Sequence, residues 1–179
     1  MQRGKEMFMK IGEEQSVFEA KFTREEIARQ ERELIFDEFT RKDALRLGRI
    51  MLDKSEELHM PFAFMIEMNG VVVLQYLPEG TGAFNEAWMR KKLRTVQMTG
   101  ISTMLFWTGM EARGLKRSTE EMLPVSDIVP CGGGFPIRLK NGTVIGAAAV
   151  SGPGDQNDHL FVTECMRALL QEKTERTAK

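Results

Sequence analysis

Three consecutive glycines directly before a Phe-Pro pair constrain the fold of this chain more than any other feature. The glycines are residues 132–134, and they stand between Cys131 and Phe135-Pro136. A backbone without side chains can adopt positive φ angles and lets a ligand or another chain come very close. Two interpretations follow from this: a tight loop that leads into a buried hairpin, or the floor of a binding pocket.

A second stretch of small residues follows shortly after the glycines. Residues 146–152 read Gly-Ala-Ala-Ala-Val-Ser-Gly, and an Asn141-Gly142 pair precedes them. Small side chains allow another element to pack closely, and Asn-Gly between apolar runs is a strong signal for a hairpin turn. The sequence therefore predicts a hairpin made of residues 137–139 and 143–151.

The composition is typical of a soluble globular protein in a reducing cytoplasm. The chain has 179 residues, 42% of them hydrophobic and 28% charged, with a net charge of -1. This balance gives no electrostatic attraction to nucleic acid, and no apolar run is long enough for a membrane helix or a signal peptide. Two cysteines do not make a disulfide framework, and Cys165 is expected to be a small buried hydrophobe. We expect an N-terminal arm over 1–22 and one domain over 23–179.

Periodicity, caps and turn signals predict helices that alternate with hairpins. Thr23 with Glu26, and Thr40 with Asp43, fit capping boxes. Asn69-Gly70 predicts a first hairpin, and the short segment 34–36 is either a helix end or a first strand. The expected helices span residues 24–33, 41–58, 86–99 with Asn85 as its cap, 101–112, 118–123 and 156–172. This order predicts an α/β (α+β) fold, with an antiparallel sheet flanked by helices and five strands if 34–36 is one.

A basic cluster follows Trp88 on the helix expected over 86–99. Lys91, Arg94 and Thr95 share one helical face, whereas Arg90 and Lys92 lie elsewhere. Four cations within five residues can bind a carboxylate or a phosphate, although a solvated helix face has the same composition.

Asp158-His159 is the second polar feature of the sequence. Asp158 suits the first turn of a helix, because the helix dipole favours an acidic residue there. His159 can carry a proton or contact a ligand near neutral pH. The two histidines, His59 and His159, stand far apart without Cys or carboxylate spacing, so no metal site is predicted.

Taken together, these segments resemble one known family. Its pattern matches Asn85-x-x-Trp88-x-x-Lys91-Lys92-x-x-Thr95, Gly132 to Ile137, Val144 to Gly152, and Asp158-His159. The chain resembles the GlcG/HbpS-like family, often labelled the haem-degrading domain, and in particular its small uncharacterised cytoplasmic branch. The resemblance covers roughly residues 24–172. It implies a profilin-like domain with a five-stranded antiparallel sheet, and homo-oligomers built on dimers. Members of this branch often carry His where this chain has Cys131.

These observations predict a cytoplasmic homo-oligomer that binds a small anionic ligand. The ligand is unknown, with haem or another tetrapyrrole and a carboxylic acid as candidates. Two alternatives stay open: a haem-degrading or other redox enzyme, and an adaptor without a small-molecule ligand. We expect Lys91, Arg94 and Thr95 to hold the anion, residues 132–136 to form the pocket floor, and Ser151 and His159 to lie at its rim. The predicted ligand-binding residues are Trp88, Lys91, Arg94, Thr95, Gly132, Gly133, Gly134, Phe135, Pro136, Ser151 and His159.

Overall fold

A computed structural model of the chain describes residues 22–115 and 127–177. The helix expected over 118–123 lies outside these residues, as does the N-terminal arm except for Phe22. The division into an arm and one domain stays a prediction. The strands are β1 (Ile35–Phe36), β2 (Ala63–Met68), β3 (Val71–Tyr76), β4 (Gly134–Leu139) and β5 (Val144–Ser151). The helices are α2 (Arg24–Glu33), α3 (Arg41–Glu57), α4 (Ala83–Thr99), α5 (Thr103–Glu111) and α6 (Asp155–Thr177).

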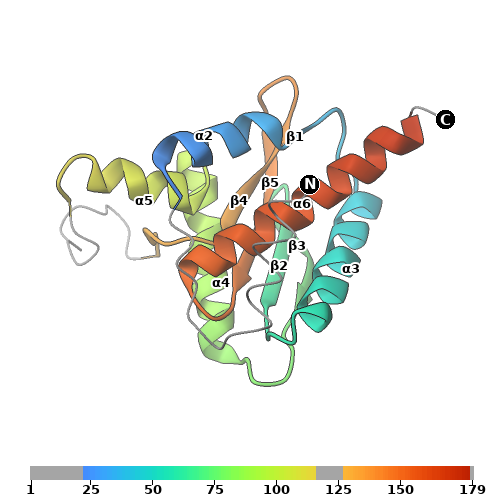
Figure 1. Cartoon of the computed structure of the whole chain (residues 1–179), viewed down its shortest axis with the longest axis horizontal. Coiled ribbons are helices and arrows are strands. Elements are labelled where there is room, and N and C mark those ends of the chain that lie inside the picture. The colour runs from blue at the N-terminus through green and yellow to red at the C-terminus, as the bar shows by residue number, and fades with distance from the viewer. Residues whose placement is uncertain (1–21, 116–126, 178–179) are drawn as a thin grey trace.

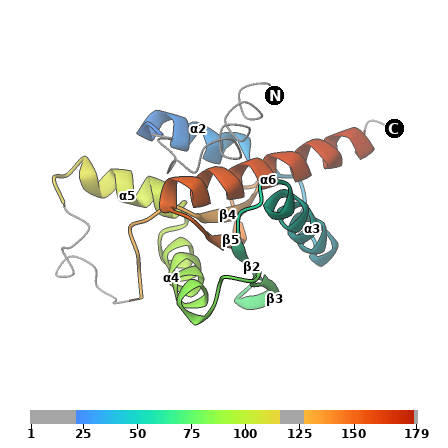
Figure 2. The same ribbon diagram turned by 60° about the horizontal axis from the view of Figure 1, so that its bottom comes forward.

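The five strands form one sheet in the order β1-β4-β5-β2-β3, with helices on both faces (Figure 1). Figure 2 shows α3 and α6 on one face and α4 on the other. Alternation along β5 decides which side chain meets which layer. Ala148 and Val150 pack in the cluster with α3 and α6, whereas Ala147 and Ala149 pack against α4. The small residues of β5 thus lie at the centre of the sheet, covered by helices on both sides.

The prediction of an antiparallel sheet is wrong for one strand pair. β1 runs parallel to β4, with Ile35 opposite Arg138, so the sheet is mixed. The other pairs, β2 with β3, β2 with β5 and β4 with β5, are antiparallel as expected. The antiparallel prediction came from the hairpins, and β1 belongs to no hairpin because α3 follows it directly. A strand of two residues carries no pattern that would indicate its direction.

Local signals predicted most helix boundaries, but α4 starts at Ala83 rather than at 86, and α6 ends at Thr177 rather than near 172. Both capping boxes form, at the starts of α2 and α3. Asn85 is not the N-cap of α4, because that helix starts at Ala83 with Gly82 as its cap. Asn85 lies in the first turn of α4 and still stabilises the start of the helix, because its Oδ1 accepts from the Gly82 N–H at 3.1 Å. Cys165 is buried, as expected.

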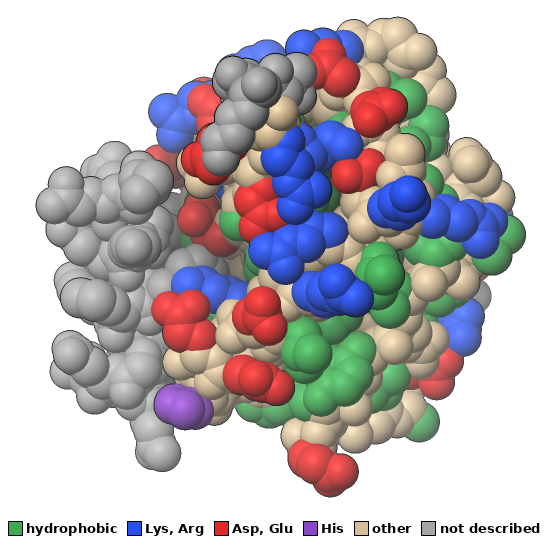
Figure 3. Space-filling model, turned by 90° about the vertical axis from the view of Figure 1, so that its right-hand side faces the viewer, with side chains coloured by type: hydrophobic (Ala, Val, Ile, Leu, Met, Phe, Trp, Pro, Cys, Tyr) green, Lys and Arg blue, Asp and Glu red, His purple; other side chains and the backbone are tan. Residues whose placement is uncertain are grey.

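The outer face of the α3 and α6 layer carries interspersed acidic and basic side chains (Figure 3). Arg46 on α3 forms two hydrogen bonds to Glu172 on α6, at 2.8 and 2.6 Å. These bonds hold the pKa of Glu172 below its usual range. Lys173 pairs with Asp43 at 2.8 Å. Both ion pairs therefore join α3 to α6 at the molecular surface. None of the helices in the described part of the chain combines the length and apolarity that a membrane span requires.

Candidate functional site

The side chains expected to bind an anion on α4 do not face solvent together. Thr95 is fully buried, and its Oγ1 accepts from the Val129 N–H at 2.8 Å and donates to the Lys91 carbonyl at 2.9 Å. Arg94 is partly exposed and lies 3.5 Å from the carboxylate of Asp127. Thr95 and Arg94 therefore tie α4 to the segment just before the three glycines.

The cation with the most specific partners on α4 is Lys92, which the sequence analysis had placed outside the site. Its side chain is 3% exposed, and its Nζ lies 2.6 Å from Asp158 Oδ2 and 2.6 Å from the Val150 carbonyl. Asp158 Oδ1 accepts from the Gly152 N–H at 2.7 Å. Burial raises the pKa of Asp158, while Lys92 and the Gly152 N–H favour its ionised form. The charges are hydrogen-bonded as well as paired, which a buried ion pair requires.

The three glycines make room for this ion pair. A Cβ at Gly133 would lie 2.6 Å from Asp158 Cβ, 2.7 Å from the Val150 carbonyl and 2.9 Å from Lys92 Nζ. Gly133 also has a φ of +104°, a conformation that L side chains rarely adopt. A Cβ at Gly132 would clash with the Asp155 carbonyl, and one at Gly134 would lie 2.6 Å from the Thr103 methyl group. Atoms of this chain therefore occupy the space beside all three glycines.

The position of the ion pair in the fold explains why it needs glycines. Lys92 lies on α4 and Asp158 on α6, which cover opposite faces of the sheet (Figure 2). Gly133 directly precedes β4 and Gly152 directly follows β5. Side chains from the two helix layers meet at this end of the sheet, and a bulky residue there would separate them.

Other predicted site residues contribute to the same end of the sheet. Ser151 is 6% exposed and its Oγ accepts from Asn85 Nδ2 at 3.2 Å. Phe135 is fully buried in the core, and Pro136 is buried as well. Trp88 is half-buried on α4, with its ring centroid 6.1 Å from that of the exposed Phe84.

His159 is completely buried and does not lie at a rim. Its Nε2 lies 2.8 Å from Gln30 Oε1, and its ring packs edge-on against Phe22 at 5.1 Å. His159 Nδ1 has no hydrogen-bond partner in the described part of the chain. Burial lowers the pKa of His159 to about 3, against an opposing effect of Asp155. The imidazole is therefore neutral in the folded protein, with the Nε2–H donating to Gln30 if Nδ1 is the unprotonated nitrogen.

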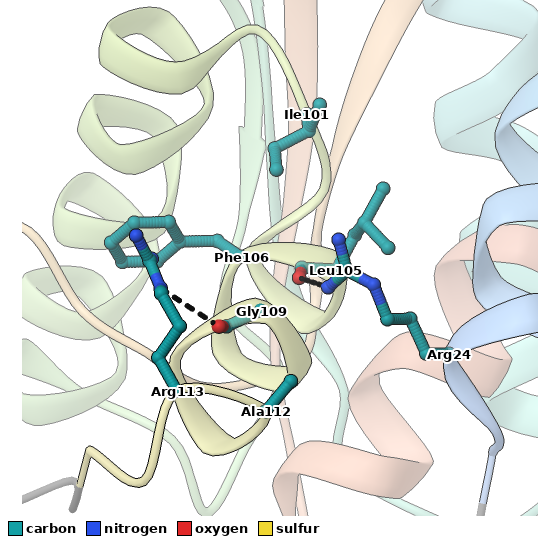
Figure 4. Close-up of a pocket in the computed structure, with 7 residues that line it drawn as sticks. All are labelled: Arg24, Ile101, Leu105, Phe106, Gly109, Ala112 and Arg113. Atoms are coloured by element: carbon teal, nitrogen blue, oxygen red, sulfur yellow. Dashed lines mark hydrogen bonds between the residues drawn. The ribbon is translucent and has the colours of Figure 1, made fainter.

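A cavity with two arginines lies between α2 and α5 (Figure 4). Its volume is about 410 Å³. Arg24 reaches over from α2 and donates to the Leu105 carbonyl at 3.4 Å, and Arg113 donates to the Gly109 carbonyl at 3.1 Å. A Cβ at Gly109 would lie 2.9 Å from Arg24 Nη1, so the glycine leaves room for the guanidinium. The lining residues are Arg24, Ile101, Leu105, Phe106, Gly109, Ala112 and Arg113.

The sequence contained a signal for Lys92 but none for this cavity. Lys92 follows Met89 by three residues and precedes Val96 by four, so it falls on the buried stripe of the helix. Arg24 and Arg113 are far apart in the sequence, and only the packing of α2 on α5 brings them together.

Comparison with solved structures shows which known proteins share this fold. A crystal structure of the Ybr137w protein has a TM-score of 0.77 and 22% sequence identity, covering 86% of this chain and 91% of that one. A complex of PduOC with haem has a TM-score of 0.62 and 18% identity, covering 73% of this chain and 94% of that one. At these identities the likeness shows the fold alone.

The sequence comparison shows the family. The model described as "Haem degrading protein HbpS-like" matches residues 39–167, which is more than half of the chain. A UPF0303 protein of Streptomyces coelicolor is 30% identical over 147 residues, which cover 82% of this chain and 93% of the relative. The chain therefore belongs to the HbpS-like family, as its motifs indicated.

The crowding around Gly133 predicts a stability difference between two glycines with positive φ. Gly142 has a φ of +88° with nothing within 4 Å of its Cβ position, so Gly142→Ala reports backbone strain alone. We expect it to lower the free energy of unfolding by about 1–2 kcal/mol. Gly133→Ala should cost about 1–3 kcal/mol more, because the methyl group also presses on the ion pair. Urea unfolding measures both variants, and equal losses would contradict the packing role of Gly133.

The buried imidazole predicts a pH dependence of stability with a defined sign. His159 has a pKa of about 3 in the folded protein, whereas an unfolded histidine titrates near 6.5. The unfolded chain therefore gains a proton first as the pH falls below 6.5, and stability is lost until the folded pKa is reached. Between pH 7 and about pH 4.5 this residue should account for a loss of about 2–3 kcal/mol.

Two variants isolate that effect in unfolding experiments across this pH range. His159→Gln, which keeps an amide donor for Gln30, should lose less stability on acidification than the wild type. His59→Asn, at an exposed position with a φ of 51°, should keep the wild-type pH dependence. If the free energy of unfolding of His159→Gln falls with pH as steeply as that of the wild type, the imidazole is not held neutral.

Proposed function

We propose that this protein binds a small anionic ligand with an apolar body in the cavity between α2 and α5. The observation that supports this proposal is the pair of arginines over an apolar lining. Arg24 and Arg113 each use a guanidinium N–H on a carbonyl of α5 and keep further donors for a ligand. Leu105, Phe106 and Ile101 supply the apolar wall. A volume of about 410 Å³ suits a small molecule.

A carboxylate is the anion that this arrangement favours. Arginine pairs with carboxylates through two parallel hydrogen bonds, and the apolar wall would contact the rest of the ligand. Tetrapyrroles belong to this class, because they join acid groups to a large apolar ring. Support for them comes from the HbpS-like family and from the haem complex of PduOC.

The lining of the cavity suits the acid groups of a tetrapyrrole better than its metal. Among the described residues, none that lines the cavity is a His, Cys or Met that could bind an iron atom. We therefore propose that the acid and the apolar ring provide recognition here, and that a simpler apolar carboxylic acid fits the same site. The protein would act in the cytoplasm, and the homo-oligomer expected from the sequence stays a prediction.

Titration with haem and with metal-free protoporphyrin IX tests this proposal. The wild type should bind both with similar affinity, followed by absorbance and by quenching of tryptophan fluorescence. Replacing Arg24 and Arg113 together by Ala should weaken binding about tenfold or more, because charge-assisted hydrogen bonds are lost.

The control is Arg29→Ala, an exposed arginine of α2 outside the lining of the cavity. It should leave both affinities unchanged. Equal binding by the double variant would contradict the proposed site, as would binding of haem without any binding of the metal-free ring.

A further inference from the structure

A second cavity, of about 350 Å³, lies between the C-terminal part of α4 and the sheet. It is walled mainly by uncharged residues of α4, of the β2–β3 turn and of β5. Its lining residues are Glu67, Asn69, Gly70, Val96, Gln97, Gly100, Val144, Ile145, Gly146 and Ala147. The single charged side chain in this list is Glu67.

Glu67 is a buried acid without a cationic partner. It is 7% exposed, and both of its carboxylate oxygens accept from Gln97 Nε2, at 2.6 and 2.7 Å. Within residues 22–115 and 127–177 it forms no ion pair. Burying a carboxylate away from water is costly unless a countercharge or several hydrogen bonds compensate for it. A neutral amide compensates only in part.

The local backbone brings Glu67 to this cavity. The pairing of β2 with β3 shifts register between Ile66 and Glu67, and such irregularities redirect side chains at binding sites. On the neighbouring strand β5, a Cβ at Gly146 would lie only 2.0 Å from the Glu67 carbonyl. Only a glycine at this position allows β5 to lie so close to Glu67.

Gln97 is the side chain that covers the carboxylate. It lies on the exposed face of α4, and exposed side chains change rotamer within nanoseconds. When its amide turns, the Glu67 oxygens can accept from another donor.

We propose that Glu67 binds an ammonium or guanidinium group that enters this cavity. The carboxylate provides the countercharge, and Val96 and Ala147, which lie on the α4 face of the sheet, contact the alkyl chain that carries the cation. Such a group can belong to a small amine or to a Lys or Arg side chain from a second copy of this chain. The cation would replace the amide of Gln97 and complete the hydrogen bonds of Glu67.

The test is an NMR titration of the isotope-labelled full chain with n-butylammonium chloride, with tetramethylammonium, which has no N–H donor, as the control probe. The wild type should show saturable shifts of the Gln97 side-chain amide and of the Gly146 N–H with n-butylammonium alone. Glu67→Gln should weaken binding about tenfold or more, because it removes the charge but keeps the shape. Gln97→Ala should bind more tightly than the wild type, and Glu79→Gln, at an exposed loop position, should bind equally.

Light scattering on the same samples distinguishes the two sources of the cation. If n-butylammonium does not bind and Glu67→Gln splits a wild-type assembly into smaller species, the cation is a side chain of a second copy. The proposal is overturned if n-butylammonium causes no saturable shift and Glu67→Gln has the wild-type mass. Equal shifts in the wild type and in Glu67→Gln, or equal shifts with both probes, would overturn it as well.

Discussion

The ion pair between Lys92 and Asp158 joins helices from opposite faces of the sheet, and the rest of the structure depends on it. Both side chains are at least 96% removed from solvent, as their exposed fractions of 3% and 4% indicate. A buried pair is tolerated only when its remaining hydrogen-bonding groups are satisfied. The Val150 carbonyl and the Gly152 N–H meet that requirement. The end of β5 must therefore keep its position between α4 and α6.

This requirement gives the most distinctive sequence motifs a structural explanation. The glycines before β4 leave space for the ion pair, and Thr95 anchors the segment that leads into them. His159, next to Asp158, fills the core as a neutral ring. The groups that we propose to bind ligands lie elsewhere, at the arginines between α2 and α5 and at Glu67 beside α4. One set of residues thus builds the scaffold, and a separate set faces the cavities.

The sequence predicted local structure well and the distribution of polar groups less well. Capping boxes and the Asn69-Gly70 turn depend on neighbouring residues, so both hairpins and the helix starts of α2 and α3 could be predicted. The parallel pairing of β1 depends on the path of the chain, which no local pattern records. Helical spacing grouped Lys91, Arg94 and Thr95, although the buried stripe through Met89 and Val96 includes Lys92 and neither Lys91 nor Arg94. Lys92 was missed because its partner Asp158 is distant in sequence.

A double-mutant cycle measures the central interaction most directly. Lys92→Met and Asp158→Asn, singly and together, would be compared by urea unfolding, since Asn keeps an acceptor for the Gly152 N–H. If the ion pair holds the two helix layers together, Lys92→Met should cost about 3–5 kcal/mol, because it leaves Asp158 buried without a countercharge. The double variant should then cost clearly less than the sum of the single losses. Additive losses, each under about 1 kcal/mol, would contradict the role of this pair, because they are typical of solvent-exposed pairs.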